Sequence, residues 1–151
     1  MKLVPDTNAD KQIDPGTKRL VRTGIETVLN PFDEYALEAA LQLRDARADG
    51  STVTVFSMAP ESSKEILRKA LAMGADDAVL LSDPALAGSD TWATSVAMAA
   101  AIETLPHDLV LMGTQSTDSL TGQLPGMLAE RLRIPGLTYV RKLAVEGGTV
   151  A

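Results

Sequence analysis

The chain has 151 residues with 20 acidic and 14 basic side chains, which gives a formal net charge of −6. That balance argues against proteins that bind nucleic acid or anionic membranes through a basic footprint. The sequence contains no cysteine and a single histidine, which excludes disulfide scaffolds, thiolate metal sites and histidine-rich metal sites. No apolar run reaches membrane-spanning length and the first residues lack a signal-peptide pattern, so we expect a cytoplasmic protein without membrane insertion.

The first thirty residues are polar and weakly periodic, and they predict a short strand at 20–22. Asn30 and Pro31 then predict the start of a helix over 31–48, because asparagine is a favoured N-cap and proline suits the first helical position. Gly50 is expected to end that helix. No convincing strand is predicted directly before it, although every later helix has one.

Strands and helices alternate along the rest of the chain. β-Branched and apolar runs predict strands, and apolar stripes that follow capping residues predict helices. The predicted strands cover residues 52–57, 78–81, 108–112 and 137–140. Three further helices are predicted. One begins at Ser62 or Ser63, the next begins at Asp90, and the last ends at Leu132. This alternation predicts an α/β fold with a doubly wound parallel sheet, in a single domain over residues 1–151.

The loop after the predicted strand 108–112 is the richest candidate for a ligand site. Ligands of open α/β sheets bind at the carboxyl ends of the strands, where helix N-termini offer N–H groups to anions. The loop has hydroxyls and amides but no lysine or arginine, so it would hold a phosphate with neutral donors. Its residues are Gly113, Thr114, Gln115, Ser116, Thr117, Asp118, Ser119, Leu120, Thr121, Gly122 and Gln123. An equally good interpretation is a loop whose polar side chains satisfy their own backbone.

The other polar residues predict no catalytic set. The sequence Asn30–Asp33 is explained by its role as a helix start. His107 has no triad partner nearby, and the P-loop pattern is absent. The methionines, Met58 among them, are typical of core packing. We therefore predict no catalytic residue and no metal ligand.

Four separated motifs closely resemble the β subunit of electron transfer flavoprotein (ETF), the family that includes the FixA-type proteins. They occur in the family's order and spacing, and the resemblance extends over essentially the whole chain. The motifs are NPFDEYAL at 30–37, ALAMGAD at 70–76, AGSDT at 87–91 and DSLTGQ at 118–123. The segment Val4–Thr7 is similar to the one that follows the family's first strand.

The resemblance implies a Rossmann-like nucleotide-binding domain of the adenine nucleotide alpha hydrolase-like type, and not an enzyme. The family's β subunit pairs with an α subunit that carries most of the FAD contacts. The heterodimer passes electrons from acyl-CoA and related dehydrogenases to the respiratory chain through ETF-quinone oxidoreductase. The implied cofactor of the β subunit is AMP in a structural role, with FAD in its place in bifurcating members.

The family also implies roles for residues of this chain. By position, Asn30, Pro31, Phe32 and Asp33 would line the adenosine side of the pocket. Met58 would lie near the nucleotide. Residues Gly113 to Gln123 would wrap the ribose and phosphates, in agreement with the interpretation of that loop as a neutral anion site.

The chain departs from the family pattern in several places. Met1–Leu3 is what remains of the usual first strand, which is central in the family's sheet, and the C-terminal third is absent. Ser119–Leu120 replaces the usual Gly-Asp, and Leu124–Gly126 replaces Val-Gly-Pro. Two alternatives stay open: a stand-alone ATP- or AMP-binding domain of the universal-stress type, and an inactive fragment of the ETF family.

Overall fold

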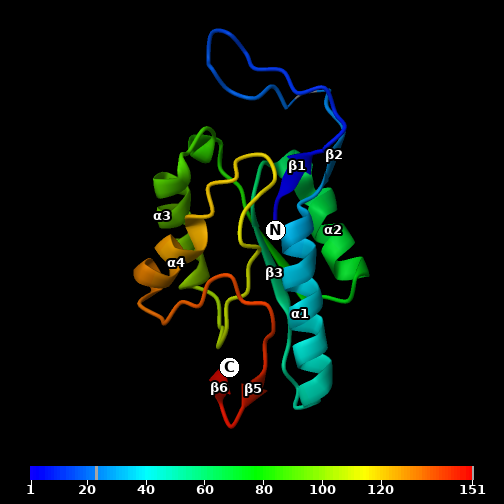
Figure 1. Cartoon of the computed structure of the whole chain (residues 1–151), viewed down its shortest axis with the longest axis vertical. Coiled ribbons are helices and arrows are strands. Elements are labelled where there is room, and N and C mark those ends of the chain that lie inside the picture. The colour runs from blue at the N-terminus through cyan, green and yellow to red at the C-terminus, as the bar shows by residue number, and fades with distance from the viewer. Residues whose placement is uncertain (23, 151) are drawn as a thin grey trace.

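The structure is a computed structural model that describes residues 1–22 and 24–150 (Figure 1). In Figure 1 the helices α1 and α2 lie to one side of strand β3, and α3 and α4 lie to the other. The helices are α1 (Pro31–Arg47), α2 (Lys64–Ala72), α3 (Thr91–Ile102) and α4 (Leu124–Leu132), with short 3₁₀ turns η1 (Glu61–Ser63) and η2 (Pro84–Leu86). The strands are β1 (Leu3–Pro5), β2 (Thr27–Leu29), β3 (Thr54–Met58), β4 (Asp77–Leu81), β5 (Val145–Glu146) and β6 (Thr149–Val150).

The helix predicted from Asn30 is confirmed as α1. Pro31 occupies its first turn, together with two acidic residues that suit the positive end of the helix dipole. Arg44 and Arg47 lie in the last turn, where cations are favoured. The chain leaves the helix at Ala48, which is left-handed with φ 48°. Leu37 and Leu41 are buried and form the face that packs on the sheet.

Strands β3 and β4 are parallel and are connected through α2, as the alternation of strands and helices predicts. Their register pairs Thr54 with Asp77 and Met58 with Leu81. Helix α2 buries Ile66, Leu67 and Ala70 against this pair. Because a crossover helix must cover one face of a parallel pair, its apolar stripe and the strands form one core.

Strand β2 lies directly before α1 and pairs antiparallel with β1, with Leu3 opposite Leu29. The expectation that α1 has no strand before it is therefore wrong. The predicted strand at 20–22 is also wrong, because Leu20 makes a single isolated bridge to Ile13. Strands β1 and β2 are each three residues long. So short a run has too little periodicity to be recognised in the sequence.

The predicted strands at 108–112 and 137–140 are not strands in the structure. Strands are stabilised by a hydrogen-bonded neighbour, and neither segment has a ladder partner among the described residues. Val110 and Met112 instead pack against the buried residues of α3 and α4. Beyond 137–140 the chain forms the hairpin β5–β6, whose turn residues Gly147 and Gly148 have φ of 54° and 80°.

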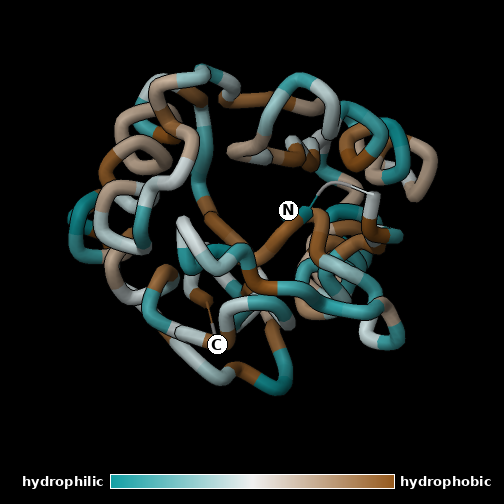
Figure 2. The backbone as a smooth tube through the Cα atoms, turned by 90° about the horizontal axis from the view of Figure 1, so that it is seen from above, coloured by the Kyte–Doolittle hydropathy of each residue, from teal (hydrophilic) through white to brown (hydrophobic). Residues whose placement is uncertain are grey.

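Hydrophobic and hydrophilic residues are interspersed along the backbone, as the brown and teal stretches of Figure 2 show. The buried apolar residues of the described chain form two clusters. The larger one joins α1, α2, β2 and β3, and the smaller one joins α3 and α4 through Ala99, Ile102 and Leu128. Asp90 caps α3 as predicted, since its carboxylate accepts from the N–H of Ala93 at 2.8 Å. The architecture is thus α/β, with helices around a small parallel sheet. Within the described part of the chain, no helix is both long and apolar enough to cross a bilayer.

Candidate functional site

The N-terminus of α1 and the start of the loop 113–123 are in direct contact. A Cβ added to Gly113 would lie 2.5 Å from Asp33 Oδ1, 2.7 Å from the carbonyl carbon of Phe32 and 2.9 Å from Asp33 N. Real Cβ atoms do not approach backbone that closely, so the absence of a side chain at Gly113 is what permits the contact. The two segments singled out as candidate sites therefore lie side by side.

Asn30 joins these two segments through its side chain. Its Nδ2 donates to the main-chain oxygen of Gln115 at 2.9 Å, and its Oδ1 accepts from the N–H of Thr117 at 3.3 Å. The residue is 1% exposed, so both amide ends are satisfied away from water. Its side chain makes no capping bond to α1, although Asn30 occupies the N-cap position. The sequence correctly predicts the helix start at Asn30, but it does not predict that the Asn30 side chain bonds to the loop 113–123.

Hydrogen bonds among its own residues hold the loop 113–123 in a compact conformation. Ser116 Oγ and Ser119 Oγ lie 2.7 Å apart, and the N–H of Leu120 donates to the main-chain oxygen of Ser116 at 2.9 Å. Leu120 is left-handed with φ 53° and its side chain is exposed. Gly122 has φ 61°, a conformation that glycine adopts without strain. The hydroxyls and main-chain groups of the loop are thus concentrated in one tight turn.

Two cations from the first 22 residues reach this loop, although the loop has none of its own. Lys2 Nζ lies 2.7 Å from Asp118 Oδ1, and Arg22 Nη2 lies 2.5 Å from Asp118 Oδ2. Burial raises the pKa of Asp118, but hydrogen bonds from Lys2, Ser116 and Arg22 outweigh it and lower that pKa to about 2. The Asp118 carboxylate is therefore charged at neutral pH, and two cations lie beside a loop from which the sequence predicts neutral donors alone.

The first two residues lie between β3 and the site. Ser57 Oγ donates to the main-chain oxygen of Met1 at 2.7 Å, and the amino group of Met1 donates to the oxygen of Phe56 at 2.5 Å. Burial lowers the pKa of that amino group, and the charge of Asp33 opposes the shift. On the other side, the N–H of Lys2 donates to Asp33 Oδ2 at 2.8 Å. The residues expected to be the remnant of a first strand thus connect β3 to the start of α1.

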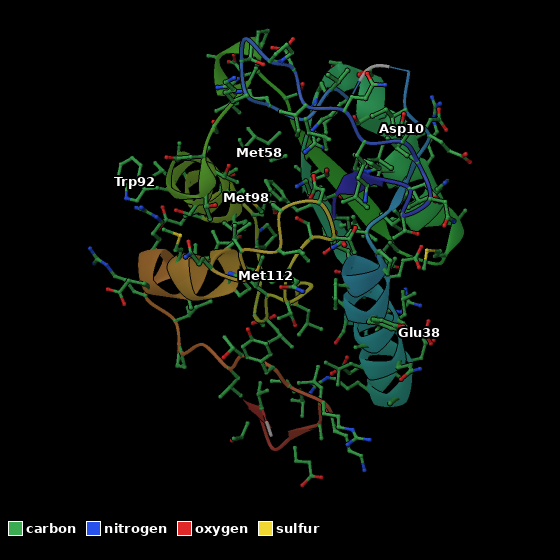
Figure 3. The ribbon with its side chains drawn as sticks, turned by 45° about the horizontal axis from the view of Figure 1, so that its top comes forward. Asp10, Glu38, Met58, Trp92, Met98 and Met112 are labelled. Carbon is green, nitrogen blue, oxygen red and sulfur yellow. The ribbon has the colours of Figure 1, made fainter. Side chains whose placement is uncertain are left out.

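Met58 is the carboxyl-terminal residue of β3 and is partly buried. In the view of Figure 3 it lies above Met98 and Met112, in the middle of the molecule. Met98 and Met112 pack on the α3–α4 cluster, as expected of core methionines. The role of Met58 beside a nucleotide stays a prediction.

Two surface hollows lie away from the loop 113–123. One, of about 460 Å³, is lined by residues between 6 and 26, and the other, of about 430 Å³, lies between α3 and α4. Both are open to solvent, and neither is lined by residues 30–33 or 113–123. The hydrogen-bonded junction of α1 with the loop is the better candidate, because it brings together the buried side chains of Asn30 and Asp118 with the cations of Lys2 and Arg22.

The remaining candidates behave as ordinary structural residues. His107 is exposed, and its Nδ1 lies 2.8 Å from the main-chain oxygen of Leu105. Trp92 is 60% exposed, and the Arg131 guanidinium lies 5.1 Å from its ring centroid. Among residues 1–22 and 24–150, no three histidine, aspartate or glutamate side chains are placed to hold a metal ion.

Sequence reasoning missed Lys2 and Arg22 as part of the site. They are 116 and 96 positions from Asp118, and neither lies in a motif that predicts such a contact. The sequence offers no signal for this contact, because the burial of Asp118, which requires a cationic partner, is visible only in the structure.

The comparisons with known proteins agree with the motifs. A model of the family described as "Electron transfer flavoprotein domain" matches residues 17–151. An "Electron transfer flavoprotein subunit beta" of Thermoanaerobacterium thermosaccharolyticum is 49% identical over 97% of this chain and 55% of its own length. "Protein FixA" of Azorhizobium caulinodans is 46% identical over 95% of this chain and 52% of its own length.

A further relative carries the name of a complex. The "Caffeyl-CoA reductase-Etf complex subunit CarD" of Acetobacterium woodii is 49% identical over 96% of this chain and 55% of its own length. The chain spans about half the length of these curated relatives.

Proposed function

Because the chain belongs to the electron transfer flavoprotein β-subunit and FixA family, we propose that it is the nucleotide-binding part of an electron-carrying β subunit. Its ligand is AMP, bound in a structural role, and FAD takes the same place if the parent complex is of the bifurcating kind. Bound AMP supplies no redox chemistry. The electrons are carried by FAD at the interface with an α subunit.

The single observation that carries the proposal is the junction made by Asn30. Its buried amide ties the start of α1 to the main chain at Gln115 and Thr117. Two segments that each offer donors to a ligand are thereby held at one place, with the N-terminus of α1 adding a partial positive charge. The donor set fits an adenine nucleotide, because hydroxyls, main-chain N–H groups and two cations match a ribose and a phosphate.

In this proposal each candidate residue has a role. Asn30, Pro31, Phe32 and Asp33 face the adenosine, and Met58 packs nearby at the carboxyl end of β3. The residues from Gly113 to Gln123 hold the ribose and phosphate. In the complete domain the β3–β4 pair belongs to a doubly wound, Rossmann-like sheet, for which its parallel register is the support.

The partners follow from the family. We expect a heterodimer with an FAD-carrying α subunit, which accepts electrons from acyl-CoA-type dehydrogenases and passes them on through ETF-quinone oxidoreductase. The relative named as a subunit of a caffeyl-CoA reductase complex supports a CoA-thioester oxidoreductase as partner. In this role the chain is a carrier subunit of the cytoplasm and not an enzyme.

Calorimetric titration of the 151-residue chain with AMP, ATP and FAD tests the proposal. We expect AMP or FAD to bind more tightly than ATP. The double variant Ser116→Ala with Ser119→Ala removes the hydroxyl pair of the loop and should weaken binding roughly 10-fold, since each hydrogen bond contributes about 0.5–1.5 kcal/mol. The matched control is Ser62→Ala with Ser63→Ala, which alters serines of the η1 turn and should leave binding unchanged.

The other outcomes identify the alternatives. A preference for ATP would indicate a universal-stress-type domain, and no binding to any of the three would indicate an inactive fragment. Co-expression with an α subunit of the family is the second test. Co-purification of the two chains with FAD is expected, and separate elution would contradict the proposed heterodimer.

A further inference from the structure

Lys2 brings an ammonium to the hydroxyls of the proposed nucleotide loop. Its Nζ lies 3.2 Å from Ser116 Oγ and 2.7 Å from Asp118 Oδ1. Ser116 Oγ in turn lies 2.7 Å from Ser119 Oγ. A lysine ammonium has three N–H donors, and the structure gives Lys2 Nζ two partners within the described residues. One donor is therefore available for an oxygen atom that enters beside the serines.

The carboxylate of Asp118 neutralises only one of the two cations, Lys2 and Arg22, that contact it. The side chain of Asp118 is 1% exposed, whereas Lys2 and Arg22 keep 42% and 51% of their side-chain surface. Two cations that share one carboxylate leave one positive charge in the cluster. This is a favourable place for an anion in a chain whose net charge is −6.

Asp33 is the other carboxylate near Lys2, and it lies at the opposite end of that residue. It accepts from the main-chain N–H of Lys2 at 2.8 Å, while the side chain of Lys2 extends to the loop. Asp33 also lies in the first turn of α1, where the helix dipole stabilises a negative charge. Its charge is thus compensated locally and does not cancel that of the Lys2 ammonium.

We propose that Lys2 is a phosphate ligand of the nucleotide site. Its Nζ donates to a phosphate oxygen while it keeps its bonds to Ser116 and Asp118, and Arg22 remains on Asp118. This inference rests on the proposed function, in which the loop holds an adenine nucleotide. It adds that the protein binds the phosphate of the nucleotide through the ammonium of Lys2, which lies 114 positions from Ser116 in the chain.

The test compares AMP with adenosine, which lacks the phosphate. Calorimetry of the full chain should show that Lys2→Gln weakens AMP roughly 10-fold to 100-fold and leaves adenosine unchanged, as expected for one hydrogen bond to a charged group. Lys2→Arg keeps the charge and should restore most of the AMP affinity. Lys11→Gln is the matched control, because it removes an exposed cation of the loop between β1 and β2.

Each other outcome has a defined meaning. Equal loss of AMP and adenosine in Lys2→Gln would make Lys2 a purely structural residue and overturn the inference. Unchanged binding of both ligands would overturn it as well. If the wild-type chain binds neither AMP nor adenosine, the inference fails; if it does not bind FAD either, the proposed function fails with it. The ratio of the two affinities therefore separates failure of the site from failure of the assignment of Lys2.

Discussion

Asn30 and Gln115 are 85 positions apart in the chain, yet the Asn30 side-chain amide donates a 2.9 Å hydrogen bond to the main-chain oxygen of Gln115. The same side chain accepts from the N–H of Thr117 at 3.3 Å. One buried amide thus fixes the loop 113–123 against the start of α1. This contact joins two segments of the candidate site through both a donor and an acceptor of one side chain.

Asn30→Asp should destabilise the chain by about 1–3 kcal/mol, because it replaces a buried donor with a carboxylate oxygen that faces the oxygen of Gln115. Urea unfolding followed by circular dichroism measures the change in the free energy of unfolding. Asn8→Asp is the matched control, since Asn8 is exposed in the loop between β1 and β2. Equal stability of the two variants would show that the Asn30 bridge does not contribute.

Gly113→Ala should displace the loop from α1 and destabilise the chain by about 1–3 kcal/mol, the range for overpacking at a tight contact. The added Cβ would lie 2.7 Å from backbone carbon of Phe32, which cannot rotate away. Gly126→Ala provides a control of opposite sign, because nothing lies within 4 Å of its Cβ position and it lies inside α4. Alanine there should stabilise by up to about 1 kcal/mol. Thermal unfolding of both variants checks the two signs, and a tolerated Gly113→Ala would refute the close contact.

The ion cluster at Asp118 should make the chain sensitive to acid. The pKa of Asp118 is 3.8 in its ordinary state and about 2 in the folded chain, so folding favours the charged carboxylate. Its contribution, up to about 2 kcal/mol, is complete above about pH 5 and is lost as the pH falls toward 2.

The measurement for this prediction is the free energy of unfolding of wild type and Asp118→Asn between pH 7 and pH 2.5. The difference between the two chains should shrink as the pH falls, because the wild-type carboxylate becomes protonated. Asp49, whose pKa is also lowered to about 2 by Ser51 and Arg47, is present in both chains and cancels in the difference. A difference that does not change with pH would contradict the charged cluster.

Arg131→Lys should loosen the contact between α3 and α4. The Arg131 Nε donates to Ser95 Oγ at 2.7 Å while its guanidinium lies over Trp92, and a lysine has no planar group that can do both. We expect a loss of about 1 kcal/mol in urea unfolding, together with a shift in the emission of Trp92, the single tryptophan of the chain. Arg68→Lys is the control, because Arg68 makes an exposed ion pair with Glu65 that lysine can keep. Equal effects of the two substitutions would mean that the packing of Arg131 contributes nothing specific.

Local sequence patterns are sufficient to predict the helices and the parallel pair β3–β4. Asn30–Pro31, Asp90 and the apolar stripe of α2 are local signals, because helix capping and helical periodicity act within a few residues. The same is true of the β-branched run that forms β3. The family could also be recognised from the sequence, since each of its motifs, at 30–37, 70–76 and 118–123, is a continuous stretch of residues.

Which apolar runs form strands, and which charged side chains lie at the candidate site, depends on the packing of distant parts of the chain. The segment 108–112 has the composition of a strand, but a strand also needs a second strand to which it can form hydrogen bonds. The residues of the segment do not determine whether such a strand lies beside it. Likewise, no local pattern brings Lys2 and Arg22 to Asp118, because the pairing requires chain segments about a hundred residues apart to fold together. Contacts that close such long loops depend on the whole packing, and that is why the charge of the candidate site could not be predicted from its own residues.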